Sequence, residues 1–253
     1  MQLPQFQTHA DLEESHWWFL GRRSVIRELL HVLLPPKKQI SLIDVGCGTG
    51  GLTAFLSDEY TCLGIDPSPD GIAFARKRFP FCTFVHGYAP QDIADTFTRA
   101  DGILLVEVLE HVKEDISFVH ELIAQMKPGA ILLIMAPADM ALWGPHDIAF
   151  EHERRYDEER LRATWKGQPV RELLVSFCNA RLYPLVRLLR VLSRWKGRAW
   201  GEGGTDITLP ARPLNALLSR IFRGEARRLV QALHGKQSGY PHGVTLIAIL
   251  QKQ

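Results

Sequence analysis

Short runs of consecutive apolar residues recur along the first half of the chain, at intervals that leave room for a crossover helix between successive strands. Runs such as ILLV and ILLIM are apolar at every position, which is typical of strands that are covered on both faces. The pattern therefore predicts five buried strands, at Ile40–Val45, Thr61–Ile65, Cys82–His86, Gly102–Glu107 and Ala130–Ala136.

The segments between these runs have helical periodicity instead. Apolar residues at helical spacing predict helices at Gly50–Asp58, Pro69–Phe79 and Glu114–Lys127. Pro80 follows the second segment and Pro128-Gly129 follows the third, and both sequences are typical helix terminators. Strands that alternate with helices in this way indicate an α/β fold with a mostly parallel, doubly wound, Rossmann-like sheet.

The pattern changes in the second half of the chain. Asp139–Tyr156 is rich in His, Asp and Arg and is predicted to be a loop, whereas Asp157–Thr164 is predicted to be a helix. Val170–Phe177 and Val244–Gln251 have the apolar content of two further strands, and a long basic segment with helical periodicity separates them. At the other end of the chain, Asp11–Leu34 predicts one helix.

Composition restricts the class of protein only a little. The 253 residues are enough for one well-buried core with a cap or a small second domain. The hydrophobic content of 46% and the charged content of 23% are ordinary for a soluble globular protein. The net charge of +2 argues neither for nor against a nucleic-acid partner, and because no recognition motif is present, no such partner is expected.

The cysteines and the N-terminus indicate the expected compartment. The four cysteines are far apart and form no Cys-x-x-Cys, so the sequence predicts reduced thiols and no metal site. The first residues show no basic-then-apolar leader pattern, and no apolar run approaches the ~20 residues that a membrane span needs. A cytoplasmic location is therefore expected.

A glycine-rich turn follows the first predicted strand. Gly46, Gly48 and Gly51 satisfy G-x-G-x-x-G, a spacing that permits a tight turn and a close approach of ligand to backbone, although a purely structural turn remains an alternative. Asp44 stands two residues before the first glycine, and Asp66 closes the second strand. A carboxylate at this turn would repel a diphosphate and would suit a ligand that carries an ammonium and a sulfonium group.

With these carboxylates in place, the sequence resembles the class I S-adenosylmethionine (SAM) dependent methyltransferases. The resemblance depends on DVGCGTGG, GIDPS, VEVLEHV and MKPGAILLI, which occur in the family's order and spacing. It implies a seven-stranded sheet with an antiparallel last strand and SAM as cofactor, bound across the carboxyl ends of the first strands. The cofactor-binding residues that it implies are Asp44, Gly46, Cys47, Gly48, Gly50, Asp66, Pro67, Tyr88, Ala89 and Glu107.

A closer resemblance extends over most of the chain. EESHWWFLGRR, LWGPHD, EHERRY and NARLYP are similar to segments of a bacterial methyltransferase subgroup that is linked to polysaccharide or secondary-metabolite pathways. This similarity implies a small-molecule acceptor or one linked to a sugar or a lipid. It does not identify the acceptor, and the sequence leaves the oligomeric state open.

Methyl transfer from a sulfonium needs an aligned acceptor and, for a hydroxyl or a protonated amine, a base. His152, His111 and His146 follow the fourth and fifth strands and are the candidate bases, with His152 preferred; each has a structural alternative as part of a turn or a helix start. This cluster of histidines slightly favours O-methylation over N- or C-methylation. The candidate substrate-binding residues are Trp17, Trp18, Trp143, Arg155 and Tyr156.

The predicted organisation has four segments: an N-terminal helical lid (1–38), a SAM-binding core (39–178), a basic helical insertion that forms a cap (179–240) and the returning last strand (241–253). Leu182–Trp195 predicts a basic amphipathic helix, which fits either a solvated cap or peripheral contact with an anionic membrane. Two other functions remain open at this point. They are an NAD(P)-dependent oxidoreductase and a SAM-binding protein without catalytic activity.

Overall fold

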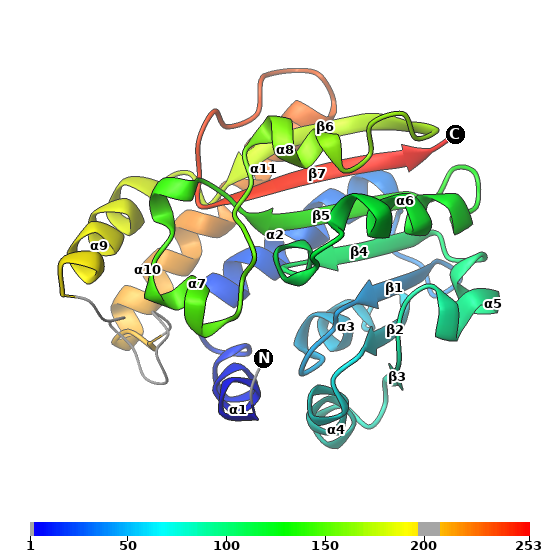
Figure 1. Cartoon of the computed structure of the whole chain (residues 1–253), viewed down its shortest axis with the longest axis horizontal. Coiled ribbons are helices and arrows are strands. Elements are labelled where there is room, and N and C mark those ends of the chain that lie inside the picture. The colour runs from blue at the N-terminus through cyan, green and yellow to red at the C-terminus, as the bar shows by residue number, and fades with distance from the viewer. Residues whose placement is uncertain (1–2, 197–207) are drawn as a thin grey trace.

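The computed structural model describes residues 3–196 and 208–253, and a seven-stranded sheet lies at its centre (Figure 1). The strand order is β3-β2-β1-β4-β5-β7-β6, and β7 is antiparallel to both of its neighbours. The predicted Rossmann-like fold and its seven strands are therefore confirmed. The strands are β1 Ser41–Val45, β2 Thr61–Asp66, β3 Thr83–His86, β4 Gly102–Val106, β5 Ile131–Pro137, β6 Val170–Cys178 and β7 Thr245–Lys252.

The central strands are buried on both faces. Every residue of β4 and β5 is buried, as their unbroken apolar sequences predict. The parallel strands β1, β2, β4 and β5 end at the same edge of the sheet, and helices α1, α7, α9 and α10 gather on that side (Figure 1). The loops that carry the predicted site residues therefore meet at this edge.

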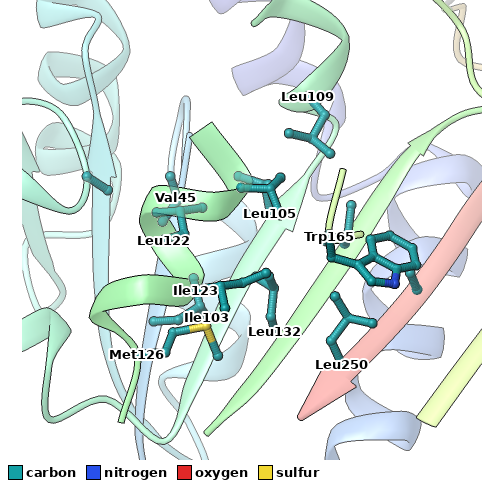
Figure 2. Close-up of a cluster of buried hydrophobic side chains, with 14 of the residues drawn as sticks. Val45, Ile103, Leu105, Leu109, Leu122, Ile123, Met126, Leu132, Trp165 and Leu250 are labelled. Carbon is teal, nitrogen blue, oxygen red and sulfur yellow. The ribbon is translucent and has the colours of Figure 1, made fainter. Parts of the chain in front are cut away.

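Helices α5 Ala94–Phe97, α6 Asp115–Gln125 and α8 Glu158–Ala163 cover one face of the sheet. Leu122 and Ile123 of α6, together with Met126 directly after it, pack on Ile103 and its neighbours in the sheet (Figure 2). The sequence predicted α6 and α8 but not the short helix α5.

The other face of the sheet is covered by α2 Trp17–Leu33, α3 Gly51–Leu56, α10 Arg212–Arg223 and α11 Ala226–Leu233. Val25, Ile26, Leu29 and Leu30 of α2 are fully buried there. Helix α4 Pro69–Arg78 packs beside β3 at the edge of the sheet. Parts of both the predicted lid and the predicted insertion thus contribute to the core of the protein.

Three elements correct or refine the sequence prediction. The single helix predicted at Asp11–Leu34 is instead two helices, α1 Leu3–Leu12 and α2, and the ring of His16 accepts a hydrogen bond from the first turn of α2. The loop predicted at Asp139–Tyr156 contains a short helix, α7 Pro145–Ala149. The predicted amphipathic helix is α9 Tyr183–Lys196.

The described part of the chain ends at 196 within the basic insertion and resumes at 208. Among the described helices, none combines the length and the apolar content that are needed to cross a bilayer.

Gly21 allows α2 and α10 to approach closely. A Cβ at this position would lie 2.3 Å from Cδ1 of Phe222, a fully buried side chain of α10. We expect Gly21→Ala to lower the free energy of unfolding by about 1–3 kcal/mol, because the added methyl group overpacks the contact between the helices. Urea-induced unfolding followed by circular dichroism measures this change.

Gly224→Ala is the matched control, because a Cβ at Gly224 would meet chiefly the movable end of the Arg181 side chain, at 2.7 Å. If the two alanine variants had equal free energies of unfolding, the close approach at Gly21 would not be the cause of any loss of stability in Gly21→Ala.

Candidate functional site

A cavity of about 850 Å³ opens at the carboxyl ends of the parallel strands, which is a volume typical of small-molecule sites. Its walls come from the glycine turn, the ends of β2, β4 and β5, the segment that joins α1 to α2, and the loop before β6. The structure brings most of the predicted site residues into this one cavity. They are Trp17, Trp18, Asp44, Gly46, Cys47, Gly48, Asp66, Pro67, Glu107, His111, His146, His152 and Arg155.

The glycine turn forms one wall of the cavity. Gly46 and Gly48 have φ values of 73° and 53°, which is the region where glycine is favoured. A Cβ at Gly48 would meet nothing within 4 Å, so the backbone there faces open space. The carboxylate of Asp66 holds the turn, because it accepts hydrogen bonds from the backbone N–H groups of Gly48 (2.9 Å) and Ser68 (2.8 Å).

Buried carboxylates surround this turn. Burial raises the pKa of Asp44 to about 6, although the hydrogen bond from Thr53 Oγ1 (2.6 Å) and the charge of Arg22 oppose the shift. Burial also raises the pKa of Asp66, against the backbone hydrogen bonds that stabilise its charged form. Glu13 contributes a third carboxylate. Such a wall attracts a cationic ligand and repels a diphosphate.

The sequence predicted an N-terminal lid, but it did not single out Glu13, in the segment that joins α1 to α2, or Arg22 of α2. Glu13 accepts a hydrogen bond from Thr49 Oγ1 (3.0 Å) and pairs with Arg78 of α4. Arg22 lies 3.9 Å from Glu107 and stacks 4.2 Å from the ring centre of Trp18. That face of Trp18 is therefore occupied by Arg22.

Three histidines also line the cavity. The rings of His111 and His152 are 4.8 Å apart, and those of His146 and His152 are 6.3 Å apart. Burial lowers the pKa of His111 to about 4 and holds the pKa of His146 well below its usual range. His111 and His146 are therefore neutral at physiological pH.

Asp147 holds His152 in place. Its Oδ1 lies 3.0 Å from Nδ1 of His152 and accepts a hydrogen bond from Nε of Arg155 (2.8 Å), while Oδ2 lies 3.6 Å from Arg190. Burial alone would raise the pKa of Asp147, but the hydrogen bond from His152 and the two arginines outweigh it and keep the pKa below the usual range. In the neutral ring of His152, the charged carboxylate favours the tautomer with its proton on Nδ1, which leaves the lone pair on Nε2.

Glu110 lies next to this cluster and is fully buried. Neither of its carboxylate oxygens has a hydrogen-bond partner among the described residues. Burial, followed by the neighbouring charge of Glu107, raises the pKa of Glu110 well above its usual value. The sequence showed Glu110 inside VEVLEHV, but only the structure shows that its carboxyl group is buried without a hydrogen-bond partner among the described residues.

Some predicted site residues lie outside the cavity wall. Tyr156 is fully buried and donates to Asp115 (2.8 Å), so its ring supports the core and its predicted substrate contact is corrected. Gly50 begins α3 with a φ of 85°, and a Cβ there would lie 2.7 Å from Phe84, so its role is in the shape of the turn. The contacts predicted for the others stay predictions, namely Tyr88, Ala89 and Trp143.

The structure also adds wall residues that the sequence did not single out. They are His9, Glu13, His16, Arg22, Glu110, Phe150, Asn179 and Arg190 among others. Several of them come from α1, α2 and α9, and their approach to the glycine turn depends on long-range packing.

Comparison with known proteins gives a family match to residues 19–181, described as "Methyltransferase domain". Curated relatives include norajmaline N-methyltransferase of Rauvolfia serpentina, 30% identical over 41% of this chain and 38% of the relative. They also include ubiquinone biosynthesis O-methyltransferase of Methylobacterium nodulans, 35% identical over 38% of this chain and 40% of the relative. The chain therefore spans about two fifths of the length of these relatives.

Solved structures share the fold. A plantazolicin methyltransferase, BamL, in complex with a triazolic desmethylPZN analog and SAH, is 17% identical and has a TM-score of 0.57 over 92% of this chain and 85% of that one. A second plantazolicin methyltransferase, BpumL, in complex with SAH, is 12% identical and has a TM-score of 0.57 over 99% and 90% of the two chains.

Proposed function

This chain belongs to the methyltransferase domain family, and from that premise we propose that it is an enzyme that transfers the methyl group of S-adenosylmethionine to a small-molecule acceptor. The observation that carries the proposal is the set of carboxylates, Asp44, Asp66 and Glu13, around an open glycine turn. The same carboxylates and the family match argue against a nicotinamide dinucleotide.

The residues at the turn fit this cofactor. Asp44 and Glu107 supply negative charge for an ammonium and a sulfonium, and the backbone at Gly48 leaves room for a close approach. Each oxygen of Asp66 accepts one backbone hydrogen bond and keeps a second lone pair for a ribose hydroxyl. When bound, SAM supplies an electrophilic methyl group on a sulfur that leaves as a neutral thioether.

We propose O-methylation, because the acceptor side of the cavity is suited to activating a hydroxyl group. His152 is the residue on which activation of the acceptor depends, since Asp147 orients its ring and Nε2 keeps a lone pair. Phe150 and Val186 provide an apolar wall, and Arg155 and Arg190 add positive charge. This combination suits a partly apolar acceptor with an acidic or hydroxylated group, including one linked to a sugar or a lipid.

The proposal also includes membership of the bacterial methyltransferase subgroup that is linked to polysaccharide or secondary-metabolite pathways.

Peripheral membrane contact through Leu182–Trp195 is a further part of the proposal. Leu185 and Leu188 of α9 are exposed beside Arg187, which is the composition of a helix that lies on an anionic bilayer. Co-sedimentation with anionic vesicles at low salt tests this, and a lack of binding to them would remove membrane contact from the proposal.

The affinity for SAM is expected to fall as the pH is lowered below about 6. Burial raises the pKa of Asp44 from 3.8 to about 6 in the ligand-free protein, so acid removes one of the charges that attract the cofactor. The charged groups that face Asp44 are Arg22, Asp66 and Glu13.

The stability of the ligand-free fold depends on pH in the opposite direction from SAM affinity. Because folding raises the pKa of Asp44, its ionisation destabilises the ligand-free fold as the pH rises through about 6.

Calorimetry of SAM binding at several pH values measures this dependence. Asp44→Asn should bind SAM more weakly and should lose the part of the pH dependence that Asp44 causes. An unchanged pH profile in this variant would assign the titration to another group.

The activity itself is tested with methyl-labelled SAM and an extract of the source cells, followed by mass analysis of the labelled product. A labelled oxygen-linked methyl group supports the proposal, whereas a labelled nitrogen or carbon would correct the preference for oxygen. Binding of SAM without any labelled product would support the alternative of a non-catalytic SAM-binding protein.

A further inference from the structure

Glu110, His111 and His152 bring three potential metal ligands together in the wall of the cavity. One ligand atom of each residue, a carboxylate oxygen or a ring nitrogen, lies within 4.8 Å of the other two. Glu110 and His111 come from the turn after β4, whereas His152 comes from the loop before β6. The fold therefore assembles the group from two separate loops.

The carboxyl group of Glu110 is buried within this group of ligands. It is 0% exposed, and neither of its oxygens has a hydrogen-bond partner among the described residues. Burial and the charge of Glu107 disfavour its ionised form, and the charges of Arg22 and Arg155 oppose this only in part. A cation bound beside Glu110 would stabilise the ionised carboxylate.

The two histidines are held as metal-binding histidines usually are. Nδ1 of His152 lies 3.0 Å from Oδ1 of the buried Asp147, and the ring of His111 donates a hydrogen bond to the backbone carbonyl of Glu151. When one ring nitrogen donates to a carboxylate or carbonyl in this way, the tautomer is fixed and the other nitrogen is left to bind a metal. Each of the two rings already makes one contact of this kind.

We propose that Glu110, His111 and His152 bind a divalent first-row transition metal ion, a site that replaces the sequence expectation of no metal. Two imidazoles and one carboxylate form a donor set typical of such ions. Ligands at ~2.1 Å from a shared ion are ~3.0–3.4 Å apart, so small side-chain rotations would bring these three atoms into place. Three protein ligands leave positions open toward the cavity.

The metal ion would also take part in the proposed methyl transfer, and this catalytic role rests on the proposed function. An acceptor hydroxyl held at an open position of the ion would have a lower pKa. The O–H bond would break with loss of the proton to water, the new O–C bond would form at the methyl carbon, and the C–S bond would break to release the neutral thioether. In this scheme His152 is a ligand of the ion and acts on the acceptor through it.

Binding of Co²⁺ to metal-free protein tests the site directly. We expect one ion per chain, with d–d absorption bands characteristic of nitrogen and oxygen ligands. Glu110→Gln and His111→Gln should each weaken Co²⁺ binding by at least about 100-fold, since even contacts to ligands are worth about 10–100-fold. His234→Ala, a change at an exposed histidine on the far end of α11, should leave binding unchanged.

A misfolded variant is detected by thermal unfolding in the absence of metal. Glu110→Gln keeps the shape of the side chain and removes a buried charge, so its melting temperature should equal or exceed that of the metal-free wild type. Equal Co²⁺ binding by the wild type and both glutamine variants would overturn the proposal.

SAM binding, measured by calorimetry in the absence of metal, separates the two proposals. If SAM binds and Co²⁺ does not, the metal site is wrong and the proposed methyl transfer stands. If Co²⁺ binds with the expected ligands and SAM does not bind under any condition, the metal site stands and the proposed function is wrong.

Discussion

Replacing His152 with alanine is expected to lower the rate of methyl transfer by about 10²–10⁴-fold, which is the range for loss of a group that handles the acceptor's proton. The structure orients this ring through Asp147 and places one of its nitrogens within 4.8 Å of ligand atoms of His111 and Glu110. The carboxylates at the glycine turn have contacts of their own that do not involve His152. SAM affinity should therefore stay within a few-fold of the wild-type value.

The rate is measured as transfer of labelled methyl to the product found in cell extract, and the affinity by calorimetry. His234→Ala is the matched control, because it removes an exposed imidazole outside the cavity. A wild-type rate in His152→Ala would exclude this residue from activation of the acceptor. A parallel loss of rate and SAM affinity would instead indicate a change in the shape of the cavity.

The sheet could be predicted because its signals are local. Strands β4 and β5 are apolar at every position, and the breakers Pro80 and Pro128-Gly129 follow α4 and α6 closely. The division between α1 and α2 was missed because the helical periodicity continues across it, and a histidine is an unusual residue at a helix start. The short α5 lacks the length that gives a periodic signal.

The glycine-turn half of the site was also visible in the sequence, since Asp44 and Asp66 stand at fixed positions relative to two strands. The other half depends on packing between distant segments. Arg190 belongs to a basic amphipathic helix, and sequence alone does not show that this arginine is buried and turned toward Asp147. Glu13 likewise reaches the turn only because α1 packs against α4.

Asp147→Ala is expected to lower the free energy of unfolding by about 3–5 kcal/mol, the usual result of removing one member of a buried ion pair. Asp147 is fully buried, and the variant would leave Arg155 and Arg190 close together without their shared carboxylate. It would also remove the acceptor for the backbone N–H of Gly144 (2.9 Å). Because the pKa of Asp147 is lowered by folding, this stabilisation is present above pH ~4 and is lost as the pH falls further.

Urea-induced unfolding at neutral pH measures the effect, and Asp58→Ala, at an exposed position, should change stability by less than about 0.5 kcal/mol. A second substitution identifies the cause. If the loss comes from positive charges left close together in the interior, Arg190→Met should recover part of it in the Asp147→Ala background, because one of those charges is then gone. If Arg190→Met recovers nothing, the loss comes from the Gly144 contact and the cavity, and the ion pairs of Asp147 contribute little.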